Sequence, residues 1–294
     1  MPDSKYLTTK EVARLCRVSD ATIKRWEDAG VLKSERTNGK HRRFRAEEVA
    51  RFQREQGLGL KRPPELPPIV NRQPRADDAD LHSSLFDFLI AGDEEETAAL
   101  LLGEFLYGTP LTAIFDELIC AAMQRIGELW YRGELTVGQE HLATRTAFNA
   151  VYKLRDAAIL PVRENGAGAA VICGIENDHH ELSNYLAQIV FENEGWQTRN
   201  FGANTPFFSL TEEILRRPPA VVCVSGTIAA DIERLSHDYR NFLERTAKLK
   251  FPVILGGRVF SDERVRRRFP AALHAQSFAA VADFLKTLSL AASD

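Results

Sequence analysis

Three stretches of the chain differ in how hydrophobic and polar residues alternate, and each predicts a different kind of domain. Near the N-terminus, apolar positions recur at helical spacing over two short segments, about residues 9–15 and 21–29. Between about residues 80 and 160, longer apolar stripes at helical spacing predict four or five helices. From Ala169 onward, short apolar runs of strand type alternate with helical segments. The pattern therefore predicts a small helical head, a helix bundle and an α/β domain.

The two short helices of the head have clear boundary signals. Thr8-Thr9-Lys10-Glu11 has the form of a capping box, Ser19 or Asp20 is suited to cap the second helix, and Gly30 is suited to end it. Two short helices with a tight turn between them are typical of a helix-turn-helix. The second helix would then present its polar residues to the DNA major groove: Thr22, Lys24 and Arg25.

A basic segment follows the second helix and predicts a wing that contacts phosphate. Asn38-Gly39 is a strong hairpin signal, and the residues after it are basic or aromatic. The candidate contacts are Lys40, His41, Arg42 and Arg43. Each of these side chains, taken alone, is equally compatible with a solvated surface charge. Together with the helix-turn-helix they indicate binding to double-stranded DNA.

The charge of the chain is distributed unevenly between the N-terminal head and the rest of the chain. Residues 1–62 hold 16 Lys and Arg against 9 Asp and Glu, a net charge of +7, although the formal net charge of the whole chain is −3. The remaining residues therefore carry −10. Such asymmetry is typical of a nucleic-acid-binding head joined to a body with another role.

The head resembles the MerR family of winged-helix regulators through YLTTKEVARL, ATIKRWEDAGVL and GKHRRF. The usual family wing is closer to Gly-Tyr-Arg-Xaa-Tyr, so individual base contacts do not carry over. The resemblance implies binding as a dimer to two-fold operators, often through a long helix after the wing. Here that helix spans only about residues 47–56, and several prolines begin a stiff linker that runs to residue 79. We therefore expect the body to assemble the heads.

The middle segment predicts a four-helix bundle with helices at about 81–91, 93–106, 111–130 and 139–156. Thr136 and Gln139 could form a capping box for the last helix, which would place Glu140 and His141 in its first turn. The simpler interpretation is that Trp130 is a core residue and Glu140 a favourable charge at a helix N-terminus. The alternative is that Trp130, Glu140 and His141 surround a ligand at one mouth of the bundle.

The last segment predicts a parallel, doubly wound sheet, whose ligands bind at the carboxyl ends of the strands. Strands are expected at 169–175, 198–201, 220–226 and 251–257, with helices at 181–194, 207–216, 229–247 and 278–291. No Gly-Xaa-Gly-Xaa-Xaa-Gly follows the first strand, which argues against a nicotinamide dinucleotide. The polar and small residues at the strand ends are Asp178, His180, Ser183, Thr205, Ser225, Thr227, Gly256 and Gly257.

Asp178 and His180 suit a metal-ligating imidazole and a carboxylate that orients it. Their spacing to Ser183, followed by Ser225-Xaa-Thr227 and Gly256-Gly257, resembles the cobalamin-binding domain. Its signature is Asp/Glu-Xaa-His-Xaa-Xaa-Gly, Ser-Xaa-Leu/Thr and Gly-Gly. The resemblance implies that His180 is the lower ligand of cobalt and that the small residues line a channel for the nucleotide tail. Ser183 stands where the signature has Gly, and His179 is a competing ligand.

In this order the three domains resemble the CarH/LitR family of light-responsive, MerR-type regulators along nearly the whole chain. Trp130, Glu140 and His141 match the family spacing. The resemblance implies adenosylcobalamin as cofactor, with the bundle covering its adenosyl group. It also implies a tetramer on operator DNA in the dark, a smaller species after light breaks the cobalt–carbon bond, repression and no enzymatic activity.

One departure from the family concerns the residue after Trp130. The relatives carry His there, whereas this chain has Tyr131, so a bis-His photoproduct at that position is excluded. Two other classes of function remain open. One is a regulator of the same fold that senses haem, a bilin or a partner protein; the other is a corrinoid methyl-carrier protein, which has no need of a DNA-binding head.

Composition adds limits to this picture. With 294 residues, 44% of them hydrophobic and 27% charged, the chain is expected to form a multidomain α and α/β protein. No apolar stretch is long enough for a membrane span, and the N-terminus lacks a secretory signal, so we expect a cytoplasmic protein. The expected domains are 1–62 (winged helix), 63–79 (linker), 80–162 (bundle) and 163–294 (cobalamin-binding, Rossmann-like). All four cysteines are expected to be reduced core residues: Cys16, Cys120, Cys173 and Cys223.

Overall fold

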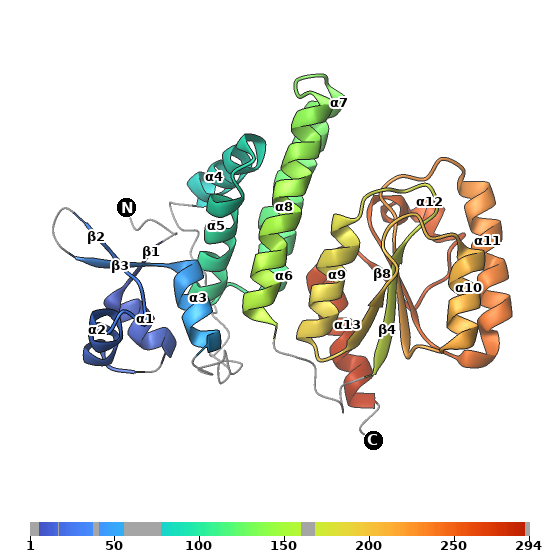
Figure 1. The fold of residues 1–294 in the computed structure, drawn as a ribbon. Helices are drawn as coiled ribbons and strands as arrows, with labels where there is room; N and C mark the ends of the chain where they lie inside the picture. Colours follow the sequence, from blue (N-terminus) through green and yellow to red (C-terminus); the bar gives the residue numbers. More distant parts are fainter. Residues whose placement is uncertain (1–5, 17, 38–40, 56–77, 160–167, 292–294) are drawn as a thin grey trace. The chain divides into compact units, whose positions relative to one another are not determined.

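The computed structural model describes residues 6–16, 18–37, 41–55, 78–159 and 168–291 (Figure 1). The chain divides into two compact units, residues 1–160 and 161–294, and each is described by itself. The predicted Asn38-Gly39 turn, Lys40 and most of the predicted linker lie outside the described residues. Within the described residues, none of the helices combines the length and the apolar composition needed to cross a lipid bilayer.

The first unit begins with a winged helix-turn-helix. Its elements are β1 (Tyr6–Thr8), α1 (Thr9–Cys16), α2 (Asp20–Asp28), β2 (Glu35–Arg36), β3 (Arg42–Arg45) and α3 (Ala46–Glu55). The strands form an antiparallel sheet in the order β1-β3-β2. Ser19 caps α2 by accepting a hydrogen bond from Thr22 N, and Gly30 follows the helix with a φ of 71°. The predicted helix-turn-helix is confirmed, and β1 is a strand that the sequence pattern did not predict.

The rest of the first unit is a bundle of helices. They are α4 (Asp78–Ala91), α5 (Glu94–Tyr107), α6 (Leu111–Ala113), the π-helical segment η1 (Ile114–Ile119), α7 (Cys120–Tyr131) and α8 (Val137–Ala158). The segments α6, η1 and α7 follow one another without a break, and α8 packs against α4, α5 and α7. Thr136 and Gln139 form the predicted capping box at the start of α8. The expected four-helix bundle is confirmed, although its third helix contains a π-helical turn.

The second unit is a five-stranded parallel sheet with helices on both faces (Figure 1). Its strands are β4 (Ala169–Gly174), β5 (Gln197–Asn200), β6 (Val221–Ser225), β7 (Val253–Gly256) and β8 (Leu273–Ala275), in the order β5-β4-β6-β7-β8. Its helices are α9 (Leu182–Asn193), α10 (Phe207–Arg216), α11 (Ile232–Thr246), α12 (Glu263–Arg266) and α13 (Phe278–Ala291), with 3-10 turns η2 (Ala247–Leu249) and η3 (Arg258–Ser261). The doubly wound sheet is confirmed, and β8 and α12 are additional.

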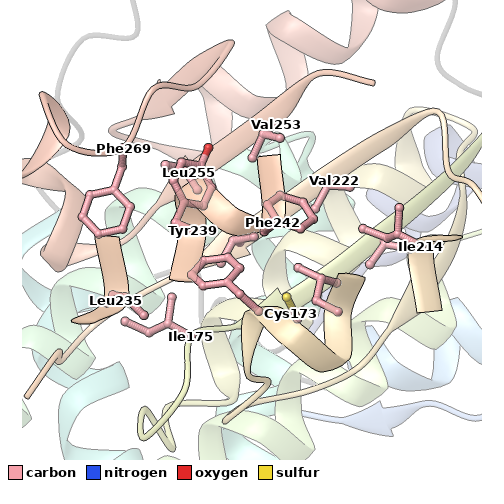
Figure 2. Packing of buried hydrophobic residues seen from close by; sticks show 14 of the residues in the cluster. Cys173, Ile175, Ile214, Val222, Leu235, Tyr239, Phe242, Val253, Leu255 and Phe269 are labelled. Atoms are coloured by element: carbon pink, nitrogen blue, oxygen red, sulfur yellow. The ribbon is translucent and has the colours of Figure 1, made fainter. Parts of the chain in front are cut away.

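The sheet forms where the predicted apolar runs lie, because a parallel strand covered on both faces needs apolar residues throughout. All five residues of β6 are buried. Helices α9 and α13 pack together, as do α10 and α11. An aromatic core lies between α10, α11 and the sheet, and Figure 2 shows Tyr239, Phe242 and Phe269 of this core. The ring of Phe242 is 5.6 Å from that of Phe207 and 5.9 Å from that of Tyr239. This core includes buried residues of strands β4, β6 and β7, and so covers one face of the sheet.

The cysteines follow the expectation in three cases out of four. Cys16, Cys173 and Cys223 are buried. Cys120 is exposed, so its predicted core position is wrong. It begins α7 directly after the buried Ile119, and the turn of the helix carries its side chain to the outer side of the bundle.

The aromatic core gives a stability prediction. Phe242→Ala is expected to lower the free energy of unfolding of residues 161–294 by about 3–5 kcal/mol, because it removes a fully buried ring from a close-packed cluster. Phe208→Ala is the matched control, since Phe208 lies on α10 with its side chain 65% exposed. We expect that change to stay within about 0.5 kcal/mol. Urea unfolding of the full chain measures both changes. Trp26 and Trp130 are replaced in every variant, so that the fluorescence of Trp196 reports unfolding of the second unit alone. Equal losses in the two variants would contradict the assignment of the core.

Candidate functional site

The sheet order places a ligand site between β4 and β6. The chain leaves β4 toward one edge of the sheet to form β5 and then returns past β4 to form β6, so the connections after β4 and β6 diverge. In open α/β sheets, ligands bind in the crevice outside the carboxyl ends of the strands at such a switch point. The loop after β4 contains Asp178, His179 and His180, and the loop after β6 contains Thr227 and Ile228.

Asp178 joins these two loops. Its side chain is buried, and Oδ1 accepts hydrogen bonds from His180 Nδ1 at 2.6 Å and His180 N at 3.1 Å. Oδ2 accepts a bond from Thr227 N at 2.5 Å and a longer one from Ile228 N at 3.4 Å. Burial acts to raise the pKa of Asp178, but the hydrogen bonds from His180 and Thr227 outweigh it, so the pKa lies below its usual value. The carboxylate is therefore ionised at neutral pH.

The ionised carboxylate determines the tautomer of His180. A carboxylate only accepts hydrogen bonds, so the proton of the neutral imidazole is on Nδ1 and the lone pair is on Nε2. The ring is about half exposed, with 49% of the side chain accessible. This is the arrangement of a histidine prepared by a carboxylate to ligate a metal. His179 is exposed, and the described contacts of Asp178 go to His180 and not to His179.

Ser183 and Ser225 meet beside this pair. Ser183 lies in the first turn of α9, Ser225 ends β6, and their hydroxyl oxygens are 2.8 Å apart. Ser225 is buried, so the contact satisfies a hydroxyl that has lost water. The two residues that the sequence assigned to one channel wall are thus in direct contact.

Glycine is required at Gly257 by both space and backbone. Its φ is 93°, and a Cβ there would lie 2.4 Å from Gly226 O. At Gly256 a Cβ would make only ordinary contacts, with Ala275 at 3.9 Å. Thr205 is held near the end of β4 by its N–H, which donates to Gly174 O at 3.0 Å.

The sequence did not reveal all the residues of this site. Ile228 is an apolar side chain, 54% exposed, next to Thr227. Asn177 and Asn204 both have left-handed backbones, and Asn204 Oδ1 accepts a hydrogen bond from Asn177 N at 2.8 Å. Asparagine tolerates this conformation better than most residues, so the two asparagines were the available sequence signal. Glu176 forms an ion pair with Arg234 of α11, which fixes the far side of the same loop.

The second group of predicted residues lies at one end of the bundle. Trp130 is 44% exposed near the end of α7, so the interpretation of Trp130 as a core residue is wrong. Glu140 and His141 begin α8, and His141 Nε2 lies 3.7 Å from Glu140 Oε2. Glu140 Oε1 also accepts a hydrogen bond from Thr144 Oγ1 at 2.9 Å. Tyr131 is 86% exposed. The indole ring of Trp130, the carboxylate of Glu140 and the imidazole of His141 thus lie on the residues that flank the α7–α8 turn.

The third group lies on the head. Lys24 and Arg25 are exposed on α2, and Arg25 lies within 3.4 Å of Thr22 Oγ1. His41 is exposed before β3. Arg42 contacts Glu27 and Asp28 of α2, so its guanidinium is held inside the domain and not presented as the sequence predicted. Lys40 lies outside the described residues.

Comparison with known proteins agrees with this arrangement. A family model described as a helix-turn-helix domain matches residues 6–57, and one described as a B12 binding domain matches residues 81–155. Together with the parallel sheet, the matches define a cobalamin-binding transcriptional regulator.

The chain is a homologue of the HTH-type transcriptional repressor CarH of Myxococcus xanthus, which confirms the resemblance to the CarH/LitR family. The two are 25% identical over 266 residues, which cover 83% of this chain and 86% of the relative. Methionine synthase of Mycobacterium tuberculosis is 25% identical over 156 residues, and the match spans 13% of that enzyme. The monomethylamine corrinoid protein of Methanosarcina barkeri has the same fold over 71% of this chain and 99% of its own, with a TM-score of 0.59 and 18% identity.

The buried carboxylate predicts a pH-dependent stability. Because the pKa of Asp178 is lowered in the folded protein, its contribution is complete above the unfolded value, near 3.8, and is lost as the pH falls below it. We expect Asp178→Asn to reduce the free energy of unfolding of residues 161–294 at pH 7 by about 1–3 kcal/mol. This difference from the unsubstituted protein should shrink below about pH 4. Urea unfolding across this range measures it, with the exposed Asp283→Asn as control. A difference that stays constant with pH would contradict the assignment.

Proposed function

We propose that the protein is a transcriptional repressor that senses light through adenosylcobalamin. In the dark it would bind operator DNA as a cofactor-stabilised tetramer, and light would convert it to a smaller species that leaves the DNA. The observation that carries this proposal is the set of hydrogen bonds from His180 and Thr227 to Asp178, at the switch point of a chain homologous to CarH. The role proposed for the chain is regulatory and not enzymatic.

The residues at the switch point fit the lower side of a cobalamin. His180 would hold cobalt through Nε2, and Asp178 would accept the Nδ1 proton in a hydrogen bond and keep the ring in one orientation. Six further residues would line the channel for the nucleotide tail: Ser183, Thr205, Ser225, Thr227, Gly256 and Gly257. Ser183, at the signature Gly position, would take part in this wall through its hydroxyl contact with Ser225 at the end of β6.

The end of the bundle fits the upper side. When bound, adenosylcobalamin supplies a cobalt–carbon bond that light breaks. Trp130 would cover the adenosyl group with its exposed ring, while Glu140 and His141 would offer a hydrogen-bond acceptor and a donor beside it. A ligand shifts a conformational equilibrium only through contacts that differ between the two states. The contacts of Trp130 are the ones that would be lost after illumination.

The head would bind the operator through α2 and the wing. Thr22, Lys24 and Arg25 would face the major groove, and His41 and Arg43 would contact phosphate, with Lys40 expected beside them. We propose the boundaries 1–62, 63–79, 80–162 and 163–294 for head, linker, bundle and cobalamin-binding domain. The tetramer would then present several heads at once, which raises the effective concentration of each at the operator.

A regulator of the same fold that responds to a different signal is the second candidate. The observation that favours it is Tyr131, which follows Trp130 with its ring almost fully exposed and brings a phenol where the CarH/LitR relatives have an imidazole. Illumination distinguishes the two candidates, because uptake of cobalamin without a change of size in light would favour the second.

His180 and His179 provide a test of the metal ligand. The full chain is mixed with adenosylcobalamin in the dark, filtered and examined by absorption spectroscopy. We expect His180→Ala to lose most of the retained cobalamin or to shift its spectrum toward a form without a protein ligand, and His179→Ala to retain it unchanged. The reverse result would move the ligand to His179. Failure of the unsubstituted protein to retain any corrinoid would refute the proposal as a whole.

Trp130 provides a test of the sensor. Size-exclusion chromatography with light scattering measures the loaded protein before and after green light. We expect a tetramer in the dark and a smaller species afterwards, and we expect Trp130→Ala to keep cobalamin but to lose the dark tetramer. Tyr152→Ala is the control, because Tyr152 is another exposed aromatic residue on the same bundle, 58% accessible against 44% for Trp130. An intact dark tetramer in Trp130→Ala would exclude its proposed role.

A further inference from the structure

One carboxylate of the head joins the recognition helix to the wing and holds two of its arginines. We propose that Glu27 is a specificity-determining residue of DNA binding, because it keeps Arg36 and Arg42 in ion pairs within the head and away from the phosphate backbone. The inference rests on the proposed binding of DNA by the head. It assigns opposite roles to the neighbouring residues Arg42 and Arg43.

Glu27 lies in the last turn of α2 and accepts hydrogen bonds from three other segments. Ser34 Oγ donates to Oε1 at 2.7 Å, Arg36 Nη2 donates to Oε1 at 3.3 Å, and Arg42 Nε donates to Oε2 at 2.5 Å. Arg42 also reaches Asp28 Oδ1 through Nη2, at 3.0 Å. The side chains of Glu27 and Arg42 are only 13% and 20% exposed. The guanidinium of Arg42 is thus enclosed between two carboxylates of the recognition helix.

The charge state of Glu27 supports a lasting ion pair. Burial acts to raise the pKa of Glu27, but the hydrogen bonds from Arg42 and Ser34 outweigh it, so the pKa lies below its usual value. Glu27 is therefore ionised at neutral pH. Releasing Arg42 to a phosphate would leave a partly buried carboxylate without its shortest hydrogen bond, which is costly.

Arg43 is in the opposite situation, although it is the next residue in β3. Successive side chains of a strand point to opposite faces, so Arg42 faces α2 and Arg43 does not. Glu35 lies across from Arg43 in the strand pairing, but its carboxylate contacts Arg45 at 3.0 Å and the hydroxyl of Tyr6 at 2.9 Å. Within the described part of the head, the structure gives Arg43 no acidic partner. Arg43 is the arginine of β3 that remains for phosphate.

The pairing of Arg36 and Arg42 with Glu27 affects the preference for an operator over arbitrary DNA more than it affects the affinity for the operator itself. Binding to DNA of arbitrary sequence comes almost wholly from phosphate contacts, whereas an operator also offers base edges to α2. Pairing two arginines with Glu27 removes phosphate contacts and therefore weakens binding to arbitrary sequence in particular. A head with a net charge of +7 would otherwise bind any duplex strongly at low salt.

The test measures how the affinity of the full chain for a short duplex of random sequence depends on salt. Each phosphate contact adds about 0.9 to the slope of log affinity against log salt. We expect Glu27→Gln to steepen the slope by about 1 to 2, because it removes the ion pair of Arg36 and leaves Arg42 with only the exposed Asp28 as a carboxylate partner. The double variant Glu27→Gln with Arg42→Ala should lose about half of that increase. Glu128→Gln, an equal change of charge on α7 that releases no arginine, should leave the slope unchanged.

Arg42→Ala and Arg43→Ala form a second, independent pair. We expect Arg43→Ala to reduce the slope by about 0.9 and Arg42→Ala to leave it unchanged. The fluorescence of Trp26, with Trp130 and Trp196 replaced, reports whether the head of Glu27→Gln folds. If it does not fold, the pair of arginine variants decides the inference. A slope in Glu27→Gln equal to that of the unsubstituted protein, or equal losses in the two arginine variants, would overturn the inference. An unsubstituted protein that binds the duplex without salt dependence would instead overturn the proposed binding of DNA.

Discussion

The hydrogen bonds accepted by Asp178 are the interaction on which the site depends. One buried carboxylate accepts bonds from both sides of the switch point, two from His180 and two from the start of the loop after β6. The connections after β4 and β6 diverge, and without a shared partner the two loops would be joined only through their strands. A neutral amide in place of Asp178 could not accept four bonds and could not determine the tautomer of the ring. The position of the His180 ring and the tautomer of its neutral form therefore follow from the same group.

Glu27 joins separate segments of the head by accepting hydrogen bonds, as Asp178 does beside the sheet, but the effect on the neighbouring side chain is the opposite. Each carboxylate is largely withdrawn from water, accepts several hydrogen bonds and joins segments that are separate in sequence. Asp178 leaves the lone pair of His180 on the nitrogen that does not contact it, so a group is prepared for a ligand. Glu27 turns the charge of Arg42 inward, so a group is withheld from one. In both places a carboxylate, unlike an amide, only accepts hydrogen bonds. It therefore determines whether the neighbouring nitrogen is left available to a ligand, as in His180, or held in an ion pair, as in Arg42.

The sequence was informative where an element is long or has a strong boundary signal. The helices of the bundle, four strands of the sheet, the Ser19 cap and the Thr136 capping box were predictable for this reason. The strands β1 and β8 have three residues each, too few to show a period. Side-chain partners across elements were not predictable, because they depend on distances that the sequence does not contain. Arg42 and Arg43 are chemically identical in the sequence, and only the packing of β3 against α2 separates them. The same holds for the contact between Ser183 and Ser225.

The distribution of charge has a sharper meaning once the elements are placed. Residues 63–160 hold 16 Asp and Glu against 7 Lys and Arg, whereas residues 161–294 hold 16 against 15. The acidity of the body therefore lies in the linker and the bundle, directly after the basic head in the sequence, and not in the sheet. Acidic surface near a duplex is repelled by its phosphates. A single head, with two arginines held by Glu27 and an acidic segment attached, is expected to bind DNA weakly by itself. In the proposed function, firm binding would come from several heads held together, because joined modules gain affinity through effective concentration without any new contact. In the proposed function, a cofactor would therefore control DNA binding by setting the number of assembled chains.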